Sequence, residues 1–80
     1  AGTYDVILAN ILAGPLVELA PRLGRSLSTG GQIILSGVLA EQVDQVATAY
    51  RDYCGEMLFQ EREGWVRLCG SRTAGKETKR

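Results

Sequence analysis

One polar side chain, Asn10, ends an apolar run and is the strongest candidate for a functional group in this sequence. The run Val6-Ile7-Leu8-Ala9 has no polar alternation, which is typical of a β-strand buried on both faces. Ala13-Gly14-Pro15 follow and predict that the strand, residues 4–10, ends near Asn10. In open α/β sheets, ligands bind beyond the carboxyl ends of the strands. The residues alone equally allow Asn10 to cap the next helix or to make a turn.

The other residue types restrict the chemistry that this site can perform. The chain has no histidine, and Cys54 and Cys69 lack metal-ligand spacing, so we expect two reduced, small core residues. A disulfide between them is an alternative that nothing in the sequence supports. We find no convincing nucleophile, general base or metal ligand, and therefore assign no catalytic residue and no metal. A carboxamide does not titrate, but it accepts a hydrogen bond from an amine or orients a bound ligand.

Composition and charge favour a small globular domain. The chain has 80 residues, 45% of them hydrophobic, with nine basic and nine acidic side chains, which is ordinary for a globular protein. No apolar run reaches the roughly 18 residues of a membrane span, and no secretory signal is visible. We therefore expect a cytoplasmic protein with no membrane partner. The basic excess lies in residues 65–80, where it favours a solvated end of the chain over nucleic-acid binding.

Helical and extended patterns alternate after Asn10. Apolar residues at steps of three and four predict an amphipathic helix over residues 14–27, with Pro15 at its first position. Pro21 is expected to kink or divide this helix. A turn over residues 28–31 leads into a second buried strand, residues 32–37, and a second helix follows over residues 40–53.

The last part of the chain predicts an antiparallel hairpin. Residues 56–61 and 65–70 read as two short strands joined by Arg62-Glu63-Gly64, in which Gly64 can take the left-handed conformation of a tight turn. Trp65 is interpreted as a hydrophobic anchor, and residues 71–80 as a disordered basic tail. The predicted fold is α/β, with two parallel βα units closed by a C-terminal antiparallel β-hairpin.

Three segments resemble a known family closely. Tyr4–Leu16, Leu35–Gln42 and Glu63–Leu68 are similar to the ribosomal protein L11 methyltransferase family (PrmA type), within the class I S-adenosylmethionine-dependent methyltransferases. The first segment is specific, because relatives that methylate amide or base nitrogens have Asn-Pro-Pro-Tyr or Asp-Pro-Pro-Tyr where this chain has Asn10-Ile11-Leu12. The resemblance implies a partial Rossmann-like methyltransferase sheet, and makes residues 1–70 the C-terminal portion of the catalytic domain.

The resemblance also implies an activity, a cofactor and a partner. The cofactor is S-adenosyl-L-methionine (AdoMet), contacted by Asn10, and the acceptors are lysine or terminal amines of a large-subunit ribosomal protein. Five further residues are weaker candidates for lining the acceptor site: Ile11, Leu12, Ala13, Ser36 and Gly37. The family's glycine-rich loop and ribose-binding acid are absent from this sequence. We therefore expect the chain to be inactive as an isolated fragment.

Two alternatives and one further expectation remain from the sequence. The chain could instead come from a methyltransferase for RNA or a small molecule, or from a nicotinamide-dependent oxidoreductase, because doubly wound sheets share this rhythm of helices and strands. The terminal hairpin argues against the oxidoreductase.

In addition, the strand Tyr4–Ala9 has no lysine or proline and no charge after Asp5, so we expect self-association through its edge.

Overall fold

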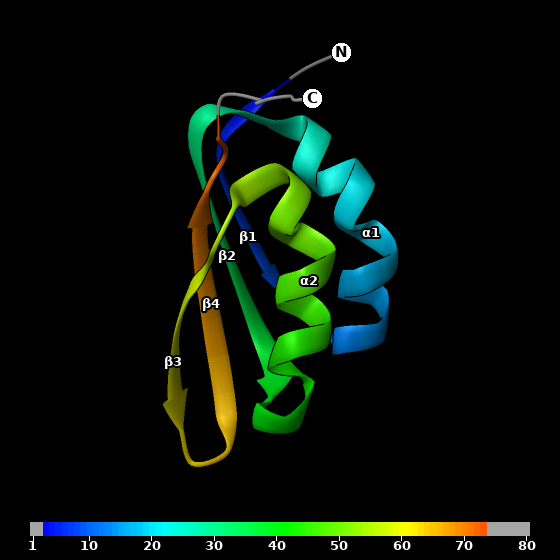
Figure 1. Cartoon of the computed structure of the whole chain (residues 1–80), viewed down its shortest axis with the longest axis vertical. Coiled ribbons are helices and arrows are strands. Elements are labelled where there is room, and N and C mark those ends of the chain that lie inside the picture. The colour runs from blue at the N-terminus through cyan, green and yellow to red at the C-terminus, as the bar shows by residue number, and fades with distance from the viewer. Residues whose placement is uncertain (1–2, 74–80) are drawn as a thin grey trace.

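The computed structural model of the chain describes residues 3–73, in which one mixed sheet is covered by two helices on one face (Figure 1). The elements are β1 (Tyr4–Asn10), α1 (Ala13–Ser26), β2 (Leu27–Leu39), a 3₁₀ turn (Ala40–Gln42), α2 (Val43–Cys54), β3 (Leu58–Arg62) and β4 (Trp65–Ser71). The strand order is β1-β2-β4-β3, with β1 parallel to β2 and both other pairs antiparallel. This confirms the predicted α/β class and the closing hairpin.

The hydrophobic core lies between the helices and the sheet. Its fully buried side chains come from α1, α2, β2 and β4, among them Leu16, Val46, Ile33 and Leu68. Tyr50 of α2 is also fully buried, and its hydroxyl donates to the backbone oxygen of Leu16 at 2.7 Å. Burial, followed by the proximity of Cys54, raises the pKa of Tyr50 to about 12. This hydrogen bond ties α2 to α1 inside the core.

The first strand occupies the predicted residues, but only one of its faces is buried. Ile7 and Ala9 pack against the core, whereas Val6 and Leu8 are 56% and 72% exposed. Successive side chains of a strand point to opposite faces, and within residues 3–73 the helices cover only one face of the sheet. The prediction of burial on both faces was therefore wrong for this part of the chain.

Helix α1 continues through Pro21 without being divided. It begins at Ala13, so Pro15 is its third residue, not its first as predicted. The missing N–H of Pro15 costs nothing there, because the first four N–H groups of a helix have no intrahelical partner. Further along, Gly24 allows α2 to approach closely, since a Cβ at Gly24 would collide with the ring of Tyr53.

The glycine-rich segment predicted as a turn lies inside β2. The register between β1 and β2 shifts between the pairs Tyr4–Leu27 and Val6–Gln32, so residues 28–31 form an irregular insertion in the strand. Gly30 takes a φ of 82°, as expected for a glycine that permits a local bend. The Ser28 hydroxyl donates to the Asp5 carboxylate at 2.8 Å, which gives Asp5 a structural role at the start of β1.

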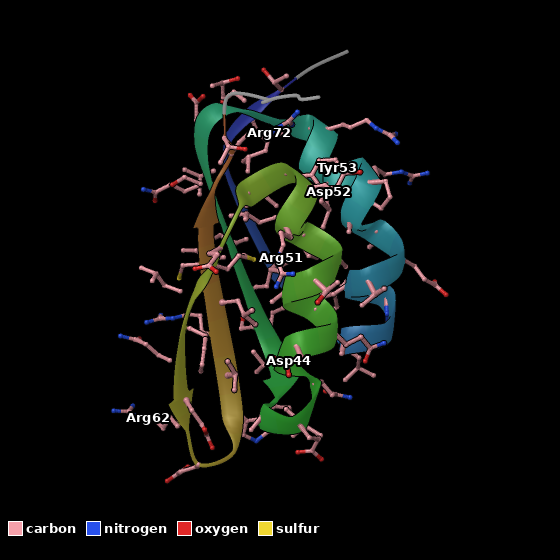
Figure 2. The ribbon with its side chains drawn as sticks, in the orientation of Figure 1. Asp44, Arg51, Asp52, Tyr53, Arg62 and Arg72 are labelled. Carbon is pink, nitrogen blue, oxygen red and sulfur yellow. The ribbon has the colours of Figure 1, made fainter. Side chains whose placement is uncertain are left out.

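The predicted disordered tail begins too early, because residues 71–73 are bound to the body of the protein. Ser71 ends β4, and the guanidinium of Arg72 donates to the backbone oxygens of Gly24 and Leu27. Arg72 also lies over the Tyr53 ring, 5.8 Å from its centroid, at the top of Figure 2. The Thr73 N–H donates to the Tyr53 carbonyl at 3.0 Å. The remainder of the predicted tail, residues 74–80, lies outside the described residues.

The predicted antiparallel hairpin is confirmed, but its strands are Leu58–Arg62 and Trp65–Ser71, and its loop is one residue shorter than predicted because Arg62 ends β3. Arg62 pairs with Trp65 across a two-residue loop, in which Glu63 and Gly64 have φ of 56° and 85°. Two successive positive φ values are the signature of a type I′ turn, whose twist suits a hairpin.

Cys54 and Cys69 are both free. Burial raises the pKa of the Cys54 thiol above its ordinary value, and this effect exceeds the opposing, lowering effect of the Arg72 charge.

Candidate functional site

Asn10 lies at the carboxyl end of β1, next to the end of β2. In the parallel register it is opposite Ser36, and its side chain is exposed. The N-cap residue of α1 is Leu12, without a side-chain cap, so the alternative that Asn10 caps this helix is wrong. The carboxamide is therefore presented at the edge where such folds bind ligands.

Gly37 supports the Asn10 side chain from β2. Gly37 has a φ of 86°, and a Cβ on it would lie 2.9 Å from Asn10 Oδ1 and 3.0 Å from the Ile11 carbonyl oxygen. The register between β2 and β4 is also irregular between Leu35 and Val38. An irregularity of this kind redirects side chains and is frequent beside active sites. Gly37 thus gives the Asn10–Ile11 segment room to cross the end of β2.

The loop after Asn10 contains two exposed apolar side chains. Ile11 is 38% exposed and Leu12 is 68% exposed, so both are available beside the carboxamide. Ala13 is only 2% exposed and belongs to the core, because it forms the first turn of α1. The structure therefore brings Ile11, Leu12, Ser36 and Gly37 to the surface near Asn10, and does not bring Ala13.

A groove of about 710 Å³ continues from this edge across the sheet toward the hairpin. Its lining comes from the end of β2 and from both strands of the hairpin: Ser36, Gly37, Gln60, Glu61, Arg62, Trp65, Val66 and Arg67. The hairpin turn extends beyond the same end of the sheet at which β1 and β2 end (Figure 1).

Sequence reasoning missed the hairpin part of this groove. Trp65, interpreted from the sequence as a hydrophobic anchor, is 53% exposed and lines the groove. Val66 and Leu68 are buried while Trp65 and Arg67 are exposed, and this alternation was visible in the sequence. Side chains two residues apart share a face of a strand, which places Trp65 and Arg67 together on the face away from the helices.

The described residues restrict what the site can do. Within residues 3–73 no group of three potential metal ligands occurs, and no helix in this part is long and apolar enough to cross a membrane. The edge itself offers a carboxamide, the Ser36 hydroxyl and the apolar side chains of Ile11 and Leu12. Such a set suits binding and orienting a reactant, since none of these groups titrates near neutral pH.

Solved structures define the class of protein to which this fold belongs. A ribosomal protein L11 methylase from Lactobacillus delbrueckii subsp. bulgaricus superposes with a TM-score of 0.80 and 33% identity, covering 91% of this chain and 38% of that one. A T. thermophilus 16S rRNA methyltransferase (RsmC), solved with AdoMet and guanosine, gives a TM-score of 0.73 at 16% identity and shares the fold. The fold is the Rossmann-like fold of methyltransferases.

Sequence comparison then identifies the family. The family model for ribosomal protein L11 methyltransferase (PrmA) matches residues 1–73, and the chain belongs to this family. Curated relatives of that name include one from Pseudomonas savastanoi pv. phaseolicola, 54% identical over 68 residues, and one from Chromohalobacter salexigens, 55% identical over 73 residues. These matches cover 85% and 89% of this chain. The chain spans about a quarter of the length of the curated relatives that it matches.

Proposed function

We propose that this chain forms part of an AdoMet-dependent methyltransferase that transfers methyl groups to lysine or terminal amines of ribosomal protein L11. The observation that carries this proposal is the exposed Asn10 carboxamide resting on Gly37 at the carboxyl edge of the parallel strands. Membership of the family supports the substrate class. A cytoplasmic location is consistent with a ribosomal substrate.

The residues at the edge fit the cofactor and the acceptor. Asn10 offers both an acceptor oxygen and two N–H donors, which suit the polar methionine end of AdoMet or the acceptor amine. AdoMet would supply an electrophilic methyl group on a sulfonium. The protein's own contribution is to hold donor and acceptor in line, and most of the rate gain in such a reaction is positional.

The acceptor amine must be neutral to attack a methyl group. The Asn10 oxygen can accept one hydrogen bond from this amine and direct its lone pair, while Ile11 and Leu12 exclude water from the other side of the loop. None of the residues assigned to the edge, Asn10, Ile11, Leu12, Ser36 and Gly37, titrates near neutral pH, and Asp5 lies at the opposite end of β1, where Ser28 donates to it. The site therefore orients the amine, and the proton leaves to solvent.

We further propose that residues 1–70 are the C-terminal portion of the catalytic domain. The strand order β1-β2-β4-β3 supports this placement, since a hairpin reverses the sheet at one edge after the parallel units. The glycine-rich loop and ribose-binding acid that the family uses for AdoMet are not in the sequence, so another part of a longer enzyme must supply them.

The test is methylation by the full-length enzyme that carries this chain. Purified enzyme, AdoMet and unmodified ribosomal protein L11 are incubated, and mass spectrometry maps methyl groups on the protein. We expect methylated amines with wild-type enzyme and strongly reduced methylation with Asn10→Ala. Methylation of ribosomal RNA or of a small molecule, with no modification of the protein, would contradict the proposal.

A further inference from the structure

The groove beside Asn10 is positively charged where it crosses the hairpin. In the antiparallel register Arg62 pairs with Trp65 and Gln60 pairs with Arg67, and paired residues of a sheet share a face. Arg62 and Arg67 therefore lie on the same face of the sheet, the one away from the helices. Figure 2 shows Arg62 pointing away from the helices. Both side chains line the groove.

Neither charge is neutralised inside the described part of the chain. The Arg67 guanidinium donates to the neutral Gln60 side-chain oxygen at 2.9 Å, and the side-chain hydrogen bonds found within residues 3–73 join neither arginine to a carboxylate. Glu61 also touches the groove, but it pairs with the buried Val66 and so faces the helix side. The groove thus carries two guanidinium groups with free donors.

We propose that this groove binds an acidic segment of the methyl-accepting polypeptide, next to the residue whose amine reaches Asn10. Guanidinium groups pair with carboxylates through two parallel hydrogen bonds and fix their orientation. Gly37 both lines the groove and contacts Asn10, so a segment lying in the groove leads directly to the proposed transfer site. The inference rests on the proposed function, because it assigns the polypeptide to the same site.

An acidic polypeptide fits this surface better than a nucleic acid does. Trp65 and two arginines could stack on bases, but phosphate binding rests on a wider basic surface. The chain has a formal net charge of zero, and Glu61 and Glu63 stand exposed at the end of the hairpin. The basic surface is therefore limited to the two arginines of the groove, which can pair with one or two carboxylates but not with a run of phosphates.

Steady-state kinetics of the full-length enzyme with ribosomal protein L11 give the first readout. We expect the double variant Arg62→Glu/Arg67→Glu to raise the KM for the polypeptide roughly tenfold or more, with kcat and the KM for AdoMet changed by less than about twofold. Arg67→Lys, which keeps the charge, should retain most of the wild-type KM. The double variant Arg22→Glu/Arg25→Glu is the matched control, because both arginines are exposed on α1, on the face of the sheet opposite the groove, and it should leave all three constants unchanged.

Binding without catalysis gives the second readout and separates the two proposals. The indole N–H signal of Trp65, which lines the groove and is kept in the double variant, is followed by NMR during titration with a capped Glu-rich peptide and, separately, with a single-stranded RNA oligomer. Shifts with the peptide that disappear in the double variant support the inference, even if the wild-type enzyme methylates no protein and the proposed function fails. Shifts with RNA alone, shifts with neither probe, or an unchanged polypeptide KM in the double variant would each overturn it.

Discussion

Replacing Gly37 with alanine should disable the site while leaving the fold in place. The new Cβ would lie 2.9 Å from Asn10 Oδ1 and 3.0 Å from the Ile11 carbonyl oxygen, at a φ of 86°. Holding a residue other than glycine in a sparsely populated backbone region costs about 1–3 kcal/mol. The Ile11 contact is with backbone and cannot move cheaply, so the Asn10 side chain must turn away. Losing one hydrogen bond to a charged or buried partner costs about 1.5–3 kcal/mol, so we expect roughly a ten- to hundredfold lower rate.

The assay is methyl transfer by the full-length enzyme, read together with its thermal stability. Gly30→Ala is the control, since Gly30 has a similar φ of 82° but nothing within 4 Å of its Cβ position. Gly30→Ala should lose comparable stability and keep the wild-type rate. The double variant Asn10→Ala/Gly37→Ala should be much less than additively slower than Asn10→Ala alone, because part of the Gly37→Ala effect acts through the same carboxamide. A Gly37→Ala enzyme with wild-type kinetics would refute the reasoning.

Four further predictions follow from the site, the strand edge and the core. Asn10→Ala in the full-length enzyme should lower the methylation rate roughly ten- to hundredfold with little change in melting temperature. A variant with the kinetics of the wild-type enzyme would show that Asn10 is only a turn residue. The 80-residue chain should bind AdoMet weakly or not at all, so a low-micromolar dissociation constant in calorimetry would contradict the missing-loop argument. The chain should also self-associate through β1, because β1 is an edge strand with exposed Val6 and Leu8. Leu8→Lys should shift the sedimentation coefficient toward that of the monomer. A strictly monomeric wild-type chain at high micromolar concentration would disprove this prediction. Finally, the folded pKa of Tyr50 is raised from 10.0 to about 12, so its stabilisation is complete below about pH 10 and is lost as the pH rises to about 12; urea unfolding should show a loss on the order of 2–3 kcal/mol that Tyr50→Phe does not show.

The sequence predicted those features that depend on local patterns. The extent of β1, the presence of a second helix and the closing hairpin each follow from apolar spacing or from a glycine that permits positive φ. The second helix was predicted over residues 40–53, whereas residues 40–42 form a 3₁₀ turn and α2 covers Val43–Cys54. Asn10 was identified because a single amide interrupts an apolar run, and its register opposite Ser36 follows from the parallel βα unit.

Other features depend on contacts between distant residues and were not predictable from local patterns. Residues 28–31 look like a turn, but the Gly30 N–H donates to the Arg72 carbonyl oxygen and the Arg72 N–H donates to the Gly31 carbonyl oxygen, which holds this segment against the end of β4. Residues 71–73 look like a tail, but the Arg72 guanidinium donates to backbone oxygens at the C-terminal end of α1 and lies over the ring of Tyr53. One face of β1 is exposed because the two helices cover only the other face. The apolar run of β1 would look the same in a strand covered on one face and in a strand covered on both.

The position of β4 inside the sheet has a consequence for synthesis on the ribosome. A chain emerges from its N-terminal side, so β1, both helices and β2 are present before β4, although β4 pairs directly with β2. Until Trp65–Ser71 emerge, β2 has an unpaired edge, and the core lacks Val66 and Leu68. An unpaired edge of this kind is prone to join other chains. Translation that stalls or terminates shortly before Trp65 would therefore leave a nascent chain with nearly all its elements and an open sheet, which is a natural target for chaperones.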